Sequence, residues 1–271
     1  METTKLTNET IKCFIPNVLT EVDGETPLAD KLAPFIDSAK IWIEAEYIGQ
    51  ENFLAGDDEN FALKILVAKA VADALPSLDL VVTPTGMAVV NTDTLAPASK
   101  DRVDRLINSL REQIRNSIPK LIEICNNYAQ WRSSERGLYF RSTFLRPSDV
   151  NNGIHGLENI SYSEARLRAI SVESKIAERY LGRNFLNALR DDYNDNIITR
   201  EHTLVSLTLS AILSIIVREE PFDQNRMWHA VRPIINELKY YSNYETLWLH
   251  DMGNQFNNQG FVNDIKGGFY F

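Results

Sequence analysis

The chain has 271 residues, of which 44% are hydrophobic and 24% are charged, and its formal net charge is −9. This composition is typical of a globular chain of one large or two ordinary domains, and it excludes disordered and collagen-like proteins. The acidic balance argues against a nonspecific nucleic-acid binder, because attraction to phosphates requires a basic surface. No stretch reaches the roughly 20 apolar residues of a membrane span. The first residues lack the basic and apolar segments of a signal peptide, and the two cysteines are expected to be reduced thiols in the cytosol.

Helical periodicity first appears after Pro27. Apolar residues recur every three or four positions from Leu28 to Tyr47, which places them on one face of a helix. Gly49 is expected to end this helix, since glycine readily adopts the left-handed conformation found at helix ends. A second helix is predicted over 61–75, and because it is apolar on several sides we expect it to be central and buried.

A β-hairpin is predicted over about 78–90. Two short runs rich in valine flank the turn sequence Thr83-Pro-Thr-Gly86, a pattern typical of paired strands. The third helix of this half is predicted over 97–131. It contains Pro119, which should kink or split it because proline removes a backbone hydrogen bond.

Residues 132–160 lose this periodicity and collect glycine, proline and asparagine, as is typical of a connection between domains. Within it, a strand is expected over 137–145. Helical patterns then resume over three ranges: 163–188, 199–217 and 223–249. From Gly253 the chain is rich in asparagine, glycine and aromatic residues.

A short duplication links the two halves. Ile43–Gly49 reads IEAEYIG and Ile176–Gly182 reads IAERYLG, while Pro119 and Pro233 have similar places in the third helix of each half. We therefore predict a mainly α fold of two related three-helix units, with an inserted β-hairpin and an irregular connecting segment. The expected divisions are an N-terminal helical unit with the hairpin (1–131), the connecting segment (132–160), a C-terminal helical unit (161–252) and an aromatic tail (253–271).

The sequence carries no recognisable catalytic or metal-binding motif. Glycine-rich phosphate loops and the Gly-x-Ser-x-Gly nucleophile motif are missing, and no two histidines have the i, i+4 spacing of helical zinc ligands. A calcium loop could start at Asp192, but Ile197 and Thr203 stand where its turn glycine and bidentate glutamate belong, so a solvated loop is favoured. Four glutamates are interpreted as solvated residues on polar helix faces: Glu44, Glu46, Glu173 and Glu178. We predict no enzyme, no cofactor and no metal.

Two groups of residues are candidates for partner binding. The first lies in the connecting segment, where arginines alternate with aromatic residues: Arg132, Arg136, Tyr139, Phe140, Arg141, Phe144 and Arg146. This composition is found at protein interfaces and suits a nucleic-acid backbone, and a solvated connector is the alternative. The second group is the tail residues Phe269, Tyr270 and Phe271, which are expected to dock on their own domain or on a partner.

The hairpin and the helix after it carry a resemblance. The segments are LVVTPTGMAVV (Leu80–Val90) and APASKDRVDRL (Ala96–Leu106), with Met87 where an aromatic residue is expected. They resemble a family of unknown function from phages and prophages of gut Bacteroidetes, in which a TPTGF-V hairpin leads into an APAS-RV-L helix start. Pro34–Ala39, Tyr47–Gly49 and the terminal Phe-Tyr-Phe also fit its pattern.

That family is similar to phage head–tail connector (adaptor) proteins, which are helical subunits that form a ring at the portal vertex. The resemblance implies a structural virion protein in a homo-oligomeric ring. Its partners would be the portal protein and tail or neighbouring connector proteins, with transient contact with passing DNA and none with a membrane. It also implies presence in the virion, and in the host cytoplasm during assembly. The family supplies no catalytic residues.

Two other classes of function remain open. A non-enzymatic cytosolic scaffold or phage assembly factor would pack its C-terminal aromatic residues on its own core. An enzyme would need a pocket between the two helical units lined by converging polar side chains, and no local spacing in the sequence supports one.

Overall fold

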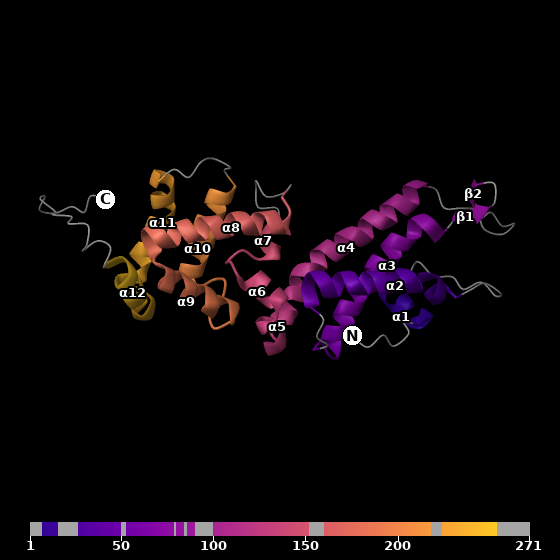
Figure 1. Cartoon of the computed structure of the whole chain (residues 1–271), viewed down its shortest axis with the longest axis horizontal. Helices are drawn as coiled ribbons and strands as arrows, with labels where there is room; N and C mark the ends of the chain where they lie inside the picture. Colours follow the sequence, from indigo (N-terminus) through magenta and orange to yellow (C-terminus); the bar gives the residue numbers. More distant parts are fainter. Residues whose placement is uncertain are drawn as a thin grey trace, which may run out of the picture. The chain divides into compact units, whose positions relative to one another are not determined.

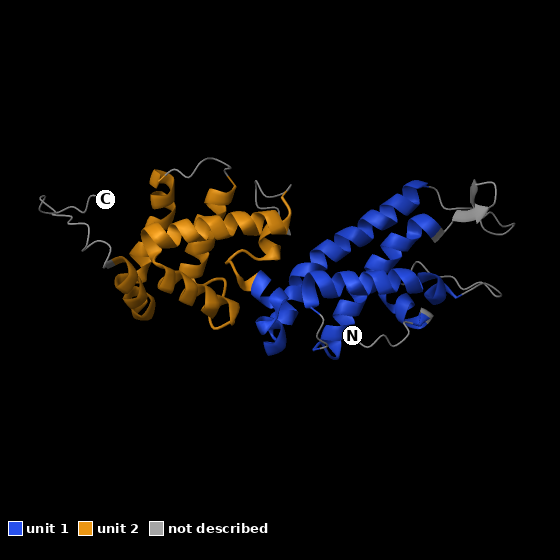
Figure 2. Ribbon diagram, viewed as in Figure 1, with its two compact units in different colours: residues 1–139 blue, residues 140–271 orange. Residues whose placement is uncertain are grey.

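The computed structural model describes residues 7–15, 27–49, 53–78, 100–151, 160–217 and 224–253, together with the backbone of two short strands. The fold is mainly α, as predicted. The chain divides into two compact units, Met1–Tyr139 (unit 1) and Phe140–Phe271 (unit 2), shown in separate colours in Figure 2 and with element labels in Figure 1. Across the described ranges, no helix is both long and apolar enough to cross a membrane.

Unit 1 is built around one central helix. Its elements are α1 (Asn8–Phe14), α2 (Leu28–Ile43), the π-helical turn η1 (Glu44–Ile48), α3 (Asp57–Leu78), α4 (Lys100–Asn126), α5 (Ala129–Ser133) and most of α6 (Glu135–Arg141). Helix α3 packs against both α2 and α4. Its small and β-branched residues are buried on several sides, among them Ala62, Ala70 and Val71, which confirms the predicted central helix. Pro119 does not split α4, which continues to Asn126.

The segment predicted as a β-hairpin is described only through its backbone. Strands β1 (Leu80–Thr83) and β2 (Gly86–Val89) are paired antiparallel, with Leu80 opposite Val89. Residues 84–85 and 90–99 lie outside the described residues. The hairpin is therefore not supported as an element of the packed fold, and it stays a prediction.

Unit 2 contains more helices than the three predicted. Its elements are α7 (Pro147–Asn151), α8 (Tyr162–Ile176), η2 (Ala177–Leu181), α9 (Arg183–Asn194), α10 (Thr203–Ile216), α11 (Gln224–Leu238), α12 (Ser242–Trp248) and η3 (Leu249–Gly253). Helix α8 begins where the Ser161 hydroxyl accepts the N–H of Glu164, a typical N-cap. Helix α10 packs against both α8 and α11.

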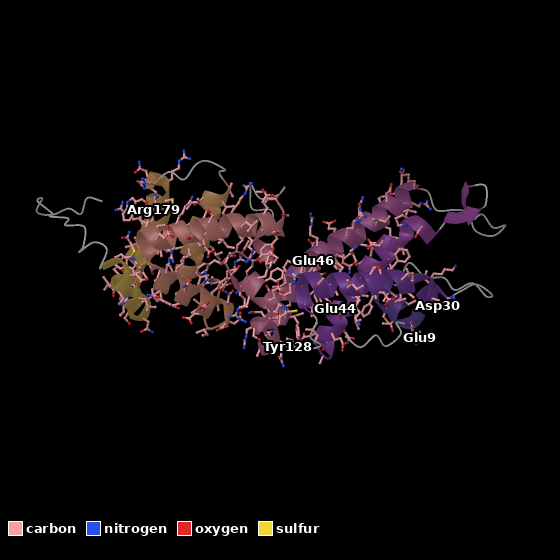
Figure 3. The ribbon with its side chains drawn as sticks, viewed as in Figure 1. Glu9, Asp30, Glu44, Glu46, Tyr128 and Arg179 are labelled. Atoms are coloured by element: carbon pink, nitrogen blue, oxygen red, sulfur yellow. The ribbon has the colours of Figure 1, made fainter. Side chains whose placement is uncertain are left out.

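The first long helix of each unit ends in a π-helical turn and a glycine. Glu44 and Glu46 lie in η1, and Arg179 lies in η2 (Figure 3). Gly49 and Gly182 follow these turns with φ values of 90° and 79°, a conformation that side chains with a Cβ rarely adopt. The predicted end at Gly49 is confirmed, whereas the continuous helix predicted over 163–188 is wrong because Gly182 interrupts it.

The connecting segment is more regular than predicted. Residues 135–141 form α6, so the strand expected over 137–145 is wrong, and α5, α6 and α7 occupy much of a segment predicted to be irregular. Short helices of five to seven residues carry too few repeats for periodicity to reveal them. The helix predicted over 223–249 is also divided, into α11 and α12.

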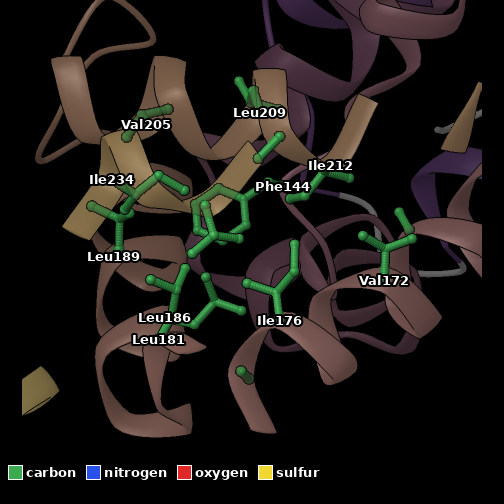
Figure 4. Close-up of a cluster of buried hydrophobic side chains, with 14 of the residues drawn as sticks. Phe144, Val172, Ile176, Leu181, Leu186, Leu189, Val205, Leu209, Ile212 and Ile234 are labelled. Carbon is green, nitrogen blue, oxygen red and sulfur yellow. The ribbon is translucent and has the colours of Figure 1, made fainter. Parts of the chain in front are cut away.

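The core of unit 2 is a single apolar cluster. Figure 4 shows side chains of α8, η2, α9, α10 and α11 converging on Phe144, which comes from the segment between α6 and α7. Phe144 and Leu145 are fully buried, so this non-helical segment belongs to the core. Its burial fixes the position of the arginines on either side of it.

Candidate functional site

The first part of the arginine-rich segment lies in unit 1. Arg132 on α5 and Arg136 and Tyr139 on α6 are half-buried, and Leu138 between them is 61% exposed. Gly137 is buried against the end of α5, where an added Cβ would lie 1.8 Å from the carbonyl oxygen of Trp131. Only glycine permits this approach, so Gly137 sets the close packing of α6 on α5.

The arginines of the second part bind residues of their own unit. The guanidinium Nη2 of Arg141 lies 2.6 Å from Oδ1 of Asp195, and Nδ2 of Asn194 donates to the carbonyl oxygen of Arg141 at 2.9 Å. The guanidinium carbon of Arg146 lies 3.8 Å from the ring centre of Tyr193, and its Nη2 donates to the Tyr193 carbonyl at 3.1 Å. Arg141 and Arg146 therefore join the segment to the end of α9.

The two phenylalanines of the segment are buried as well. Phe140 stacks on Tyr162 of α8 with ring centres 5.6 Å apart, and Phe144 stacks on Tyr193 of α9 at 6.2 Å. Residues 140–146 therefore do not form an exposed surface of alternating arginine and aromatic side chains. The sequence pattern does not distinguish an interface from an internal junction, since both combine aromatic and guanidinium groups.

Two aspartates at the end of α9 and just after it contact side chains distant in the sequence. Asp195 pairs with Arg141, and Oδ2 of Asp192 accepts the Tyr244 hydroxyl at 2.6 Å. Burial, together with the hydrogen bond to Asp192, raises the pKa of Tyr244, so its hydroxyl stays protonated. The solvated-loop interpretation is wrong for Asp192, which lies in α9 and contacts a side chain distant in the sequence, whereas Asp195 is exposed, as that interpretation expects.

A buried carboxylate anchors the other end of the segment. Asp149 is completely buried, and its Oδ2 accepts the N–H of Arg146 at 2.8 Å. Its Oδ1 pairs with the guanidinium of Arg200, which precedes α10. The ion pair compensates the burial of this charge, and it connects α7 with the segment before α10.

Glu173 is the most perturbed acidic group of unit 2, and its interpretation as a solvated residue is wrong. It lies on α8 with only 4% of its surface exposed, and its Oε1 accepts the backbone N–H of Phe144 at 2.9 Å. Nη1 of Arg190 lies 3.5 Å from Oε2. Burial raises the pKa of Glu173 to about 7, although both contacts favour the carboxylate. Sequence periodicity did not reveal it, because its partners come from α9 and from the segment before α7.

The C-terminal aromatic residues, the cysteine of α4 and possible metal ligands complete the comparison with the sequence predictions. Phe269, Tyr270 and Phe271 lie outside the described residues, so their predicted docking is untested by the structure. Cys125 is fully buried on α4, as its place among apolar residues predicts, and burial raises the pKa of its thiol to about 12. Where the structure describes side chains, no group of three or more His, Cys, Asp or Glu residues could hold a metal ion.

The comparison with protein families identifies a domain in the N-terminal half of the chain. Residues 15–141 match a family described as "Family of unknown function (DUF6712)". This stretch covers most of unit 1 and ends two residues after Tyr139, where unit 1 ends. No curated protein and no solved structure matches the chain. The chain thus contains a domain of unknown function in its N-terminal half.

Proposed function

We propose that the chain is a structural virion protein, a head–tail connector (adaptor) ring subunit that docks between the portal and the tail of a tailed phage or prophage. The resemblance in Leu80–Val90 and Ala96–Leu106 supports this proposal, and both segments lie inside the stretch that matches the family. The chain would be present in the virion, and in the bacterial cytoplasm during assembly.

The observation that carries the proposal is a pair of exposed apolar side chains on the outer side of α8. Ala165, Ala169 and Val172 of this helix are buried in the unit 2 core. On its other side, Leu167 is 61% exposed and Ile170 is 37% exposed. These two residues lie three positions apart and therefore share a face. A helix that exposes two neighbouring apolar side chains suits a subunit in which a neighbour covers them in an assembly.

The contacts of the arginine-rich segment narrow the predicted partner-binding residues. Arg141 and Arg146 are used inside unit 2, so their replacement should weaken the unit itself. Partner contacts would fall to Arg132, Arg136 and Tyr139 of unit 1, and to the tail residues Phe269–Phe271. The proposed partners are the portal protein, tail or neighbouring connector proteins and, transiently, passing DNA.

Quantitative mass spectrometry of purified particles from the source strain tests the proposal. We expect the chain in the particles at a fixed ratio to the portal protein. Absence from the particles, with the chain present in the producing cells, would overturn the virion role and leave an assembly factor or a cytosolic scaffold.

Substitutions on α8 test the surface itself. Leu167→Glu combined with Ile170→Glu should keep the helical circular dichroism spectrum and lower incorporation into particles at least tenfold. Ile197→Glu is the matched control, since Ile197 is 69% exposed in the segment between α9 and α10. Normal incorporation of the α8 double variant would exclude this face as a docking surface.

A further inference from the structure

The two units end their first long helix in the same rare way. In each, the last five residues form a π-helical turn, η1 or η2, and a glycine of positive φ follows. The N–H of Gly49 donates to the carbonyl of Glu44 at 2.7 Å, and that of Gly182 donates to Ala177 at 2.9 Å. π-helical turns are uncommon. Their occurrence at matching positions of IEAEYIG and IAERYLG therefore favours a common origin of the two segments over chance similarity.

A tryptophan from the end of each unit binds this turn. The indole Nε1 of Trp131, on α5, donates to the carbonyl oxygen of Tyr47 at 2.9 Å. In unit 2, Nε1 of Trp248, on α12, donates to the carbonyl oxygen of Tyr180 at 2.8 Å. Both accepting tyrosines stand two residues before the glycine that follows the π-helical turn.

A tyrosine that precedes each tryptophan makes a second matching bond. The hydroxyl of Tyr128 donates to Oδ2 of Asp58 at 2.7 Å, and that of Tyr244 donates to Oδ2 of Asp192 at 2.6 Å. Each tyrosine stands three or four residues before the tryptophan of its unit. The tyrosine–carboxylate contact is thus repeated in kind, although its acceptor lies on α3 in unit 1 and on α9 in unit 2.

A phenylalanine packs on the same tyrosine ring in both units. Phe53 lies with its ring centre 5.1 Å from that of Tyr128, and Phe185 lies 5.9 Å from Tyr244. Both phenylalanines belong to an Asn-Phe-Leu sequence a few residues after the glycine, and the leucines, Leu54 and Leu186, are buried. The similarity between the halves therefore extends beyond the heptapeptide.

The order of helix packing is also the same. In unit 1, α3 packs between α2 and α4, and in unit 2, α10 packs between α8 and α11. The units differ by additions: α9 lies between the glycine and the central helix in unit 2, and residues 79–99 separate the second and third helices in unit 1. Such additions are tolerated in repeated domains because they leave the shared core intact.

We infer that unit 2 is a second, diverged copy of the domain in unit 1, and that one chain supplies two successive positions of the connector ring. This inference rests on the proposed function. A closed ring repeats one pair of complementary faces around its axis, so two domains of the same architecture can fill neighbouring positions. A ring built from this chain then needs half as many chains as positions.

The copy number of the chain in whole particles tests the inference. Peptides of the full chain and of the portal protein are quantified against isotope-labelled standards in the same digest. If the connector ring has one position per portal subunit, the ratio of this chain to the portal protein is about one half. In such a ring, a ratio of one would overturn the inference and leave the connector role standing. Absence of the chain would overturn the proposed function instead.

The symmetry of the ring gives a second, independent readout. A cryo-electron microscopy reconstruction of the particle should contain two domains of related fold per chain at equivalent radius and height in the ring. Placement of unit 1 in the ring with unit 2 at a different height or radius would overturn the inference. This measurement needs no variant, so a folding defect does not affect it.

Discussion

Replacement of Glu173 by glutamine should change how stability depends on pH. The side chain is buried on α8, and burial raises its pKa to about 7, against an ordinary value of 4.5. A raised pKa in the folded state means that the folded protein binds the proton more tightly than the unfolded chain does. The stability that protonated Glu173 gives to the folded state is therefore fully present below pH 4.5, and it is lost as the pH rises from 4.5 through 7.

The size of the effect follows from the two pKa values. Each pKa unit corresponds to about 1.4 kcal/mol. Ionisation of Glu173 should therefore lower the free energy of unfolding of unit 2 by about 3 kcal/mol at pH 8 relative to pH 4. Glutamine keeps an oxygen that accepts the N–H of Phe144 and carries no charge at any pH. As the pH rises from 4 to 8, the free energy of unfolding of Glu173→Gln should therefore increase relative to that of the wild type by at most about 3 kcal/mol.

Urea denaturation followed by circular dichroism at pH 4, 6 and 8 measures this difference. Because the chain divides into two compact units, we expect two unfolding transitions, and the one assigned to unit 2 is the relevant one. Glu164→Gln is the matched control, since Glu164 lies on the same helix and is about half exposed. Equal pH dependence of Glu173→Gln and the wild type would refute the assignment of a raised pKa to Glu173.

The other contacts are tested by paired substitutions and by thiol labelling. Trp131→Phe and Trp248→Phe should each lower the free energy of unfolding by about 1–3 kcal/mol in urea, because each leaves a backbone carbonyl without its indole donor. An effect at only one site would contradict the equivalence of the two contacts. Gly182→Ala should lower the melting temperature more than Gly49→Ala, because a Cβ at Gly182 would lie 2.5 Å from a neighbouring side chain, whereas that at Gly49 meets open space. Equal decreases in melting temperature would contradict this expectation and show that backbone strain at positive φ alone accounts for the destabilisation. A thiol reagent at pH 8 should label one cysteine per native chain and spare Cys125, whose pKa is raised to about 12; rapid labelling of both would refute its burial.

The inferred duplication illustrates what local patterns can predict. The heptapeptides Ile43–Gly49 and Ile176–Gly182 predict that the two halves are related, and the predicted helix end at Gly49 is confirmed. The same glycine at 182 was missed, because apolar spacing continues through α9 and conceals the break. The π-helical turns that precede both glycines leave no mark in a periodicity of 3.6 residues.

The sequence by itself determined the mainly α class, the central buried helix α3 and the burial of Cys125. Each of these depends on the spacing of apolar residues along one segment, which is a local property. Only the tertiary structure decided which charged and aromatic residues are internal. Arg141, Glu173 and Phe144 read as surface or interface residues until α8, α9 and the segment before α7 are brought together. The physical reason is that the burial of a polar group depends on partners that are distant in the sequence, and no local pattern specifies them.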